Sequence, residues 1–585
     1  MRLCEQKNRS VIILIALSAI FFFIYAWFPY LTTRNQAYFA SPDATANYLW
    51  IERFAQGKEL FYTEPLNLIT DDMVVPRSLR SDDGLVKPVS FLGMIFVYGY
   101  IAKFLGMWIV PYLTVFFAIV GAWFFYGIIK IIFNNYIAWW SALMLLMLPP
   151  YWYYAARGLF HNVLFTVMLM AGVYFFIKYS SPSKPTASLR RYINPIGLGI
   201  AGVFIGLAVF TRTSEVIWLV PTMLLIAIIY CQKICQPKFI IFFLGLGLAL
   251  IPIFYYNQIL YGNYFNFGYE SVADNIDRFY QTSVNTGVGV SVQSIISAKI
   301  IPFGLDFKSA SRHFFEYYVQ IFWYLFWPAF GGGLLWLRNW SSLDMRKKTY
   351  FIIFILVSFI LGIFYGSWNI NDSVAKNTIT IGNSYTRYWL PIYIMSIPLA
   401  IIAWQWLAIF LSQFLIKHNW REFKVKIKLL DITDSMLDNN IKSVTVMLVV
   451  VMLLVLFFSQ STVIFSSGEG LNATVNSLAV NQELTVDVLR YIDSDAVVIT
   501  PNLDKFIWPS RKVISKDIFA PATHVAVTKL LNIKVPVYYY GFILRPEHLS
   551  LLNDQSLAEF FLKIKPIKIY NKNKLGLYQI TGDEK

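Results

Sequence analysis

An aspartate near the N-terminus combines an acidic group with a position that would hold it in place. Asp43 follows Ser41 and Pro42, a pattern that is typical of the first turn of a helix. Asn47 comes four residues later and would lie on the same helical face. An acid fixed in this way can act as a general base that deprotonates an acceptor hydroxyl. It can equally serve only to complement the helix dipole, and both interpretations fit the pattern.

A lysine and two pairs of acids follow in the same polar segment. Lys87 precedes Pro88, where the chain turns apolar again, so its ammonium group is placed to bind a phosphate. A lysine that only extends toward lipid headgroups at a helix end is the common alternative. Acid pairs are candidates for a divalent cation or are plain solvated loop, and the two pairs are Asp71 with Asp72 and Asp82 with Asp83.

Several cationic residues stand at the edges of apolar stretches farther along the chain. Ionisable groups at the ends of membrane spans mark functional sites by default, and a group of cations suggests a lipid phosphate as substrate. For Arg212, the alternative is an ion pair with Glu215 that joins two helices. These residues are Arg157 with His161, Arg212 with Glu215, and Arg387 with Tyr388.

The composition shows what kind of protein must position these groups. Of the 585 residues, 57% are hydrophobic and only 14% are charged, whereas soluble domains carry about 25% charged residues. This excludes a disordered chain and an ordinary soluble enzyme and indicates a polytopic membrane protein. The net charge of +16 is attributed to cytoplasmic loops and not to nucleic-acid binding. Three cysteines exclude a disulfide framework.

Apolar stretches of about 20 residues can cross a bilayer as helices, and the sequence predicts eleven to thirteen of them, a mainly α transmembrane bundle. Shorter candidates are 88–102, 158–177 and 216–232, of which 88–102 is predicted not to cross, because an odd number of segments between 32 and 178 must do so. The longer stretches are 11–33, 104–129, 131–156, 192–211, 239–269, 317–337, 349–371, 388–416 and 443–468.

The basic loops predict an orientation. Lys and Arg gather in short loops at 178–191, 338–348 and 417–428 and at Lys233 and Lys238, which we expect in the cytoplasm. Residues 1–467 would then form the transmembrane domain of a plasma or inner membrane protein. Extracytoplasmic parts would be the loops 32–87 and 258–312 and a small α/β domain at 468–585.

Strands and helices are expected in that C-terminal domain, but no soluble-enzyme motif is found. Residues 496–501 and 535–541 predict strands, 575–580 predicts an edge strand, and 480–493 and 546–562 predict helices. We find no P-loop, nucleophile elbow, HExxH or paired CxxC. A cytoplasmic nucleotide-binding domain therefore has no support.

Together these features resemble the GT-C class of integral membrane glycosyltransferases, within the branch of protein O-mannosyltransferase-like and aminoarabinose transferase-like proteins. The resemblance covers most of the chain and rests on the order of short motifs. The motifs are Pro42-Asp43-Ala44, Lys87-Pro88, Arg212 after a glycine-rich span, Arg387-Tyr388-Trp389-Leu390-Pro391, and the segment from Asp504 to Lys512.

The resemblance implies a role for each candidate residue. Asp43 would be the catalytic base, and a polyprenyl-phosphate sugar would be the donor, with inversion at the anomeric carbon. Lys87 and Arg387 would hold the donor phosphate, supported by Arg212 and Tyr388. Further support would come from Asn47, Asp82, Asp83, Arg157 and His161. The acceptor would be a glycan, a lipid or a protein.

Two positions depart from the pattern, and other functions stay open. Ala44 stands where a second acid is frequent, and His161 stands where an acid often follows the arginine. A polymerase or ligase of lipid-linked glycans would share the spans and outer loops. A transporter or flippase would instead need a cavity that opens alternately to both sides. A non-catalytic member that only binds glycan or partner proteins is the third alternative.

Overall fold

The computed structural model describes residues 2–33, 39–180, 188–231, 236–268, 304–370, 378–417, 447, 450–451, 454–455, 457–466 and 468–582. The chain divides into two compact units. Unit 1 comprises Met1–Pro29, Tyr112–Pro252 and Val272–Ala473, and unit 2 comprises Tyr30–Pro111, Ile253–Ser271 and Thr474–Lys585. Most of the expected outer loop 258–312 and part of the expected span 443–468 lie outside the described residues.

Long apolar helices dominate the chain, as the sequence predicts. Among the described residues, 7 helices are long and apolar enough to cross a membrane, and 3 shorter apolar helices accompany them. This confirms a polytopic helical membrane fold. The long helices are α1 (Arg2–Thr33), α5 (Val110–Ile132), α8 (His161–Ser180), α9 (Ser188–Thr211), α12 (Ile240–Tyr261), α17 (Met345–Gly366) and α19 (Leu390–Lys417).

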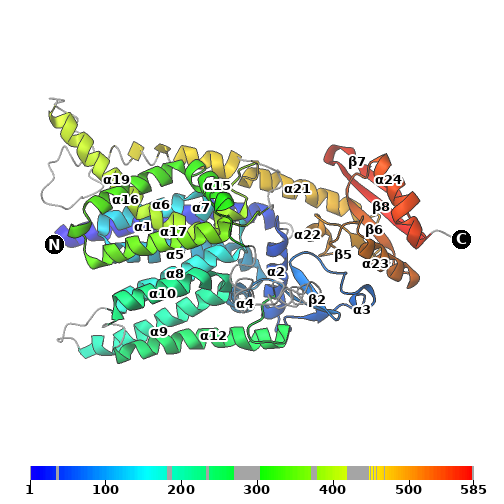
Figure 1. Ribbon diagram of the computed structural model, residues 1–585, viewed down its shortest axis with the longest axis horizontal. Coiled ribbons are helices and arrows are strands. Elements are labelled where there is room, and N and C mark those ends of the chain that lie inside the picture. Colours follow the sequence, from blue (N-terminus) through cyan, green and yellow to red (C-terminus); the bar gives the residue numbers. More distant parts are fainter. Residues whose placement is uncertain are drawn as a thin grey trace, which may run out of the picture. The chain divides into compact units, whose positions relative to one another are not determined.

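Unit 1 is a bundle in which helices pack in neighbouring pairs. Helix α8 packs on α9, α16 (Trp323–Arg338) on α19, and α10 (Val216–Ile229) on α17. Figure 1 shows these helices running alongside one another. Gly332 allows α16 to approach α19 closely, because a Cβ atom there would lie 2.0 Å from the carbonyl oxygen of Leu399.

The predicted span 131–156 is interrupted in the structure. It consists of α6 (Asn135–Met147) and α7 (Pro149–Arg157), with Leu148 extended between them at ψ 119°. A residue before proline is pushed out of the helical region by the proline ring, and Pro149 then begins the next helix. The expectation of one continuous helix was therefore wrong, and the break brings α7 to the candidate site.

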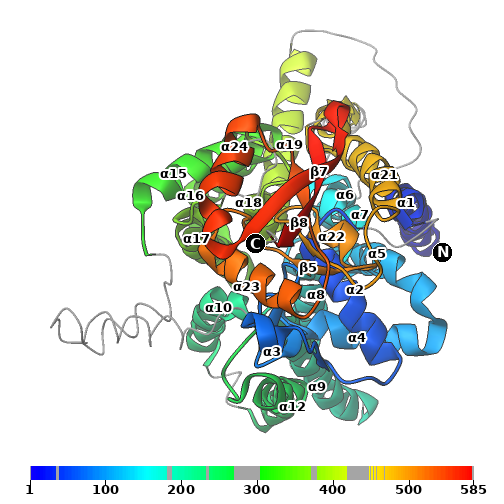
Figure 2. The ribbon, with the colours of Figure 1, turned by 90° about the vertical axis from the view of Figure 1, so that its right-hand side faces the viewer.

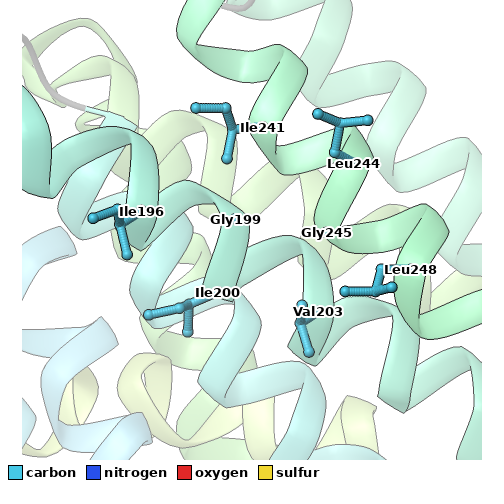
Figure 3. Close-up of a pocket in the computed structure, with 8 residues that line it drawn as sticks. All are labelled: Ile196, Gly199, Ile200, Val203, Ile241, Leu244, Gly245 and Leu248. Atoms are coloured by element: carbon cyan, nitrogen blue, oxygen red, sulfur yellow. The ribbon is translucent and has the colours of Figure 1, made fainter.

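An apolar groove lies between α9 and α12 (Figure 3). Its volume is about 460 Å³. The two helices approach closely beside it, since a Cβ atom on Gly245 would lie 2.2 Å from the Gly199 carbonyl oxygen. The lining side chains are aliphatic: Ile196, Ile200, Val203, Ile241, Leu244 and Leu248, together with the two glycines.

Unit 2 contains two sheets. The smaller joins β1 (Tyr62–Thr63), β3 (Leu85–Pro88) and β2 (Leu79–Asp82) in antiparallel order. It stands between helix α2 (Pro42–Ala55) and helix α4 (Leu92–Leu105) in the sequence. The 14-residue α4 is one of the shorter apolar helices. That the segment 88–102 does not cross stays a prediction.

The larger sheet has the strand order β5-β4-β6-β8-β7. Its parallel half is β5 (Lys512–Ile514), β4 (Val497–Ile499) and β6 (Val537–Phe542). Its antiparallel half adds β8 (Leu575–Gly582) and β7 (Leu562–Tyr570), which lie side by side in Figure 2. The helices of this region are α21 (Leu471–Val488), α22 (Asp504–Ile507), α23 (Pro521–Asn532) and α24 (Pro546–Leu551).

The prediction of an edge strand at 575–580 was wrong, because β7 continues the sheet beyond it. Strand β7 carries Lys563, Lys565, Pro566 and Lys568, so its sequence does not read as a buried strand. Lysines, proline and the register shift between Pro566 and Lys568 are the features that protect a sheet edge from pairing with another chain.

The N-terminal segment of unit 2 is built into the core of the larger sheet. Val74 is buried in one apolar cluster with strand residues such as Val497 and Tyr578 and with Val527 of α23. Asn67 holds the Val74 backbone on both sides, accepting from its N–H at 2.7 Å and donating to its carbonyl at 3.2 Å. Residues from both ends of the chain therefore share one core.

Candidate functional site

Two arginines of unit 1 share one aromatic ring. Arg157 ends α7, and Arg387 lies on α18 (Ser384–Tyr388). Their guanidinium carbons lie 5.5 Å and 5.1 Å from the centroid of the Phe160 ring. Both side chains are half-buried. An aromatic face attracts a cation, so Phe160 can hold two positive groups near each other.

The backbone between α7 and α8 makes this arrangement feasible. Gly158 and Leu159 both have positive φ, at 62° and 55°. A left-handed leucine is uncommon and costs free energy, and such residues gather at functional sites. The Leu159 N–H donates to the hydroxyl of Thr114 at 3.2 Å, which holds the turn in place.

Arg212 is buried in a polar group of its own. Its Nε donates to a Glu215 carboxylate oxygen at 2.5 Å, and another guanidinium nitrogen donates to the Tyr365 hydroxyl at 3.0 Å. The Tyr365 hydroxyl in turn donates to Glu215 at 2.8 Å. Arg212 and Glu215 are only 7% and 2% exposed. The Arg–Glu pair that the sequence offered as an alternative is thus present.

Tyr388 connects the two arginine groups. Its ring centroid lies 4.6 Å from the Arg212 guanidinium carbon and 5.2 Å from that of Arg387. It also stacks on Tyr365, with centroids 4.5 Å apart and planes inclined by 23°. We call the assembly of Arg157, Phe160, Arg387, Tyr388 and Arg212 the arginine–aromatic cluster. The assembly brings together three guanidinium groups, a chemistry that suits an anion.

The sequence reasoning missed three residues that hold the cluster. Phe160 itself was not singled out. Asn162, near the start of α8, donates its side-chain N–H to the Arg387 carbonyl at 3.1 Å. The Tyr154 hydroxyl lies 2.9 Å from the Thr386 hydroxyl. The aromatic-rich run before His161 was the available signal, but nothing in it indicates which ring meets an arginine.

His161 begins α8 directly after Phe160 and is 7% exposed. Arg157 donates to the Tyr153 hydroxyl at 2.6 Å and lies 5.0 Å from that ring. The Tyr153 hydroxyl donates in turn to the backbone carbonyl of Glu469 at 2.7 Å. In the described part of the chain, Arg157 thus contacts the neutral side chains of Tyr153 and Phe160.

In unit 2, Asp43 occupies the first turn of α2, as predicted. Ser41 is the N-cap residue with extended backbone, and Pro42 begins the helix. The hydroxyl of Ser78 donates to Asp43 Oδ1 at 2.5 Å. Asn47 follows one turn later, is fully buried, and accepts from the Ser90 hydroxyl at 2.6 Å. The half-buried carboxylate of Asp43 thus has a defined orientation.

Lys87 lies on β3 opposite Arg80 of β2. Its ammonium nitrogen is 3.2 Å from Asp82 Oδ2, and its side chain is 13% exposed. Asp82 also accepts from Arg80 Nε at 2.7 Å, so one carboxylate serves two cations. Asp83 is exposed in the turn that follows, with φ at 50°.

The acid pairs have local structural partners. Asp72 accepts from the Ser81 hydroxyl and from the backbone N–H groups of Asp83 and Gly84, which fixes the turn between β2 and β3. Asp71 pairs with Lys529 at 2.7 Å. Within the part of the chain that the structure describes, no three or more His, Cys, Asp or Glu side chains gather in a way that could hold a metal ion.

The predicted site residues therefore form two groups, one in each unit. Unit 1 brings Arg212, Arg387, Tyr388 and Arg157 together and places His161 beside them. Unit 2 places Asp43 and Asn47 on one helix. Lys87, Asp82 and Asp83 lie at the β2–β3 hairpin of unit 2.

No family model matches the sequence, and no curated protein sequence matches it either. Solved structures do match. The oligosaccharyltransferase of Archaeoglobus fulgidus, tethered to an acceptor peptide containing the NVT sequon, is 10% identical with a TM-score of 0.51. The same organism's oligosaccharyltransferase AglB, in complex with an inhibitory peptide and a dolichol-phosphate, is 10% identical with a TM-score of 0.52. Both matches cover 92% of this chain and 70% of the other.

ArnT from Cupriavidus metallidurans, in the apo state, also matches, at 12% identity and a TM-score of 0.48, with 97% of each chain covered. At these identities the likeness concerns the fold, and the two oligosaccharyltransferase structures are sufficient to establish it. The predicted resemblance is confirmed at that level: this chain has the fold of the GT-C membrane glycosyltransferases.

Proposed function

We propose that this protein is a membrane glycosyltransferase that takes a sugar from a polyprenyl-phosphate donor and transfers it to an extracytoplasmic glycan, lipid or protein. The observation that supports this most is the arginine–aromatic cluster within a GT-C fold. AglB, which shares the fold, has been solved with a dolichol-phosphate. A lipid of that chemistry is the donor proposed here.

The arginine–aromatic cluster is suited to the phosphate of such a donor. Arg157 and Arg387 are half-buried and share the Phe160 ring, so a phosphate between them would neutralise two like charges. Arg212 is already paired with Glu215, and its role is to hold Tyr388 against Arg387. Cations fixed in this way stabilise the negative charge that grows on a departing phosphate. Lys87 is proposed as a further cation for the donor.

Asp43 is proposed as the general base. The acceptor hydroxyl would give its proton to the Asp43 carboxylate while its oxygen attacks the anomeric carbon. The bond from that carbon to the phosphate oxygen would break, and polyprenyl phosphate would leave with the bonding electrons. A single displacement of this kind inverts the anomeric carbon. The hydrogen bond from the Ser78 hydroxyl to Oδ1 orients the carboxylate for this step.

The test is the release of free polyprenyl phosphate. Purified protein is incubated with a panel of polyprenyl-phosphate sugars and a crude acceptor extract, alongside Asp43→Asn and the matched control Asp71→Asn. Asp71 forms only an exposed ion pair with Lys529, so its variant should keep activity. Release by the wild type and the control, but not by Asp43→Asn, supports the proposal and names the sugar. Release of polyprenyl pyrophosphate would indicate a lipid-linked glycan polymerase, and lipid transfer across vesicles without release would indicate a flippase.

We propose that the protein resides in the plasma or inner membrane. Asp43 and the C-terminal domain would lie on its extracytoplasmic side. Lys58 is exposed after α2, and Cys231 is exposed after α10 at a loop predicted to be cytoplasmic. In intact cells, a membrane-impermeant maleimide should label Lys58→Cys but not the native protein. Labelling of the native protein, and none at position 58, would reverse the orientation.

A further inference from the structure

We infer that Asp504 and Lys505, in the C-terminal part of unit 2, are positioning residues for the Asp43 carboxylate. They act through Arg77 and Ser78 and through the start of helix α2. The inference rests on the proposed function, in which Asp43 is the base. It assigns a task to the C-terminal sheet region that neither the fold nor the proposed chemistry supplies.

The first contact is an ion pair between residues 427 positions apart in the sequence, in which the carboxylate is buried and the arginine side chain is 36% exposed. The Asp504 side chain is fully buried, and its Oδ1 accepts from two guanidinium nitrogens of Arg77, at 2.9 Å and 2.6 Å. Its other oxygen, Oδ2, accepts from the Arg77 backbone N–H at 2.8 Å. Arg77 also donates to the Asn502 carbonyl at 2.9 Å. Asp504 therefore fixes both the side chain and the backbone of Arg77.

The next residue along the chain carries this constraint to the candidate base. Ser78 has φ at 65°, a left-handed conformation that is uncommon for a residue other than glycine. In this conformation its hydroxyl donates to Asp43 Oδ1. Because Asp504 holds the backbone N–H and the side chain of Arg77, the residue directly before Ser78, it restricts the direction of that hydroxyl. A strained backbone that persists through surrounding contacts is typical of a functional site.

The second contact holds the helix that bears Asp43. Lys505 donates from Nζ to the Ala40 carbonyl at 2.6 Å, one residue before the N-cap Ser41. Ala40 also packs against Phe506, the residue after Lys505. The two neighbours Asp504 and Lys505 thus hold Asp43 from two sides, through Ser78 and through the beginning of α2.

A general base must lie within hydrogen-bond reach of the proton it removes, and a misplacement of about 1 Å can cost roughly a hundredfold in rate. The same region offers other ion pairs: Lys529 pairs with Asp71, and Lys512 pairs with Glu64 at 2.8 Å. We assign the positioning role to α22, and the contact between Lys529 and Asp71 provides the control.

The experiment compares Asp504→Asn and Lys505→Met with Lys529→Met. We expect kcat to fall roughly ten- to a hundredfold in the first two, with KM for the lipid donor unchanged within about twofold. Lys529→Met should match the wild type. Wild-type kcat in a folded Asp504→Asn or Lys505→Met protein, or a rise in KM alone, would overturn the inference.

Ser78→Gly gives a second test that leaves the Arg77–Asp504 ion pair in place. Glycine accepts the positive φ without strain, so this variant removes the side chain with its hydroxyl and leaves the backbone conformation accessible. It should reproduce the loss in kcat, and combining it with Asp504→Asn should add little. Normal kcat in a folded Ser78→Gly protein would overturn the inference.

Hydrogen–deuterium exchange separates this inference from the proposed function. Backbone amides at 43–47 should exchange faster in Asp504→Asn and Lys505→Met than in Lys529→Met, whether or not a donor is turned over. If exchange is faster in the two variants but the wild type shows no transferase activity, the contacts do hold the start of α2, and the proposed function is refuted. Unchanged exchange in an active enzyme would refute the positioning role.

Discussion

The guanidinium groups of Arg157 and Arg387 lie over the same ring, that of Phe160, at 5.5 Å and 5.1 Å from its centroid. Chain segments separated by more than 200 residues supply the two arginines, and the hydrogen bond from Asn162 to the Arg387 carbonyl keeps them in register. The cluster thus gathers positive charge at one ring, as the proposed phosphate site requires.

Replacing Phe160 by leucine should weaken the binding of a polyprenyl phosphate. Each cation–π contact contributes about 0.5–1 kcal/mol when exposed and about 2 kcal/mol when desolvated. Losing both should cost about 1–2 kcal/mol, roughly a five- to thirtyfold rise in Kd. Titration of the purified protein with a polyprenyl phosphate measures this. Phe326→Leu, whose ring packs on Phe330, is the control. Equal Kd values for the two variants would contradict the prediction.

Replacing Lys87 by alanine should lower turnover. In known enzymes, one fixed hydrogen-bond donor to the departing negative charge lowers the activation barrier by about 2–4 kcal/mol. Polyprenyl phosphate release under saturating donor measures the effect on kcat. Lys58→Ala removes an exposed lysine of the same unit and should leave kcat unchanged. Near-wild-type kcat in a folded Lys87→Ala protein would show that Lys87 does not stabilise the departing phosphate.

The buried group around Arg212 should be a stability determinant of unit 1. Glu215→Ala would leave a buried guanidinium without its carboxylate, which typically costs about 3–5 kcal/mol. Tyr365→Phe would remove one hydroxyl from the same group and should cost about 1–3 kcal/mol. Thermal unfolding in detergent should rank Tm as wild type, then Tyr365→Phe, then Glu215→Ala. The reverse order of the two variants would refute this account.

A pH-dependent contact joins α21 to the edge strand β7. Hydrogen bonds from Lys568 and then from Tyr570 hold the pKa of Asp487 below its usual value, and the bond to Asp487 raises the pKa of Lys568. The Asp487 contribution to stability is present above the ordinary pKa of about 3.9 and is lost as pH falls through the lowered value. The Lys568 contribution is present below about 10.4 and is lost as pH rises through the raised value.

Lys568→Met should therefore lower Tm near neutral pH, and the difference from wild type should shrink toward pH 2 and above pH 11. Lys565→Met, on the same strand, serves as the control. A difference in Tm that stays constant from pH 7 down to pH 2 would show that Lys568 contributes by packing and not by its charge.

Local sequence rules predicted part of the site well. Ser41-Pro42-Asp43 placed Asp43 in the first turn of a helix, because capping and proline preferences act over a few residues. The length of apolar stretches predicted the membrane helices, because it too is a property of a continuous segment of the chain. The position of Arg387 and Tyr388 at the edge of an apolar stretch singled them out, and the structure places them together with Arg212.

The remainder depends on contacts that no local pattern contains. Ser78 and Arg77 lie in a polar segment without distinguishing features, and their partners are a side chain 35 residues away and another 427 residues away. Strand β7 was missed because its lysines protect an edge and so hide the periodicity of a strand. The predicted span 131–156 failed at Leu148, where a proline effect on one residue outweighs the apolar character of its neighbours.

The burial of Val74 in the core of the C-terminal sheet has a consequence for biogenesis. The strands that cover Val74 are translated about 400 residues later, which takes roughly 20–80 s at about 5–20 residues per second. During that interval Val74, Leu66 and Met73 lack their native cover. We expect nascent chains that stop before β4 to be held by a chaperone or cleaved within residues 60–80, and chains that extend beyond β8 to resist the same protease.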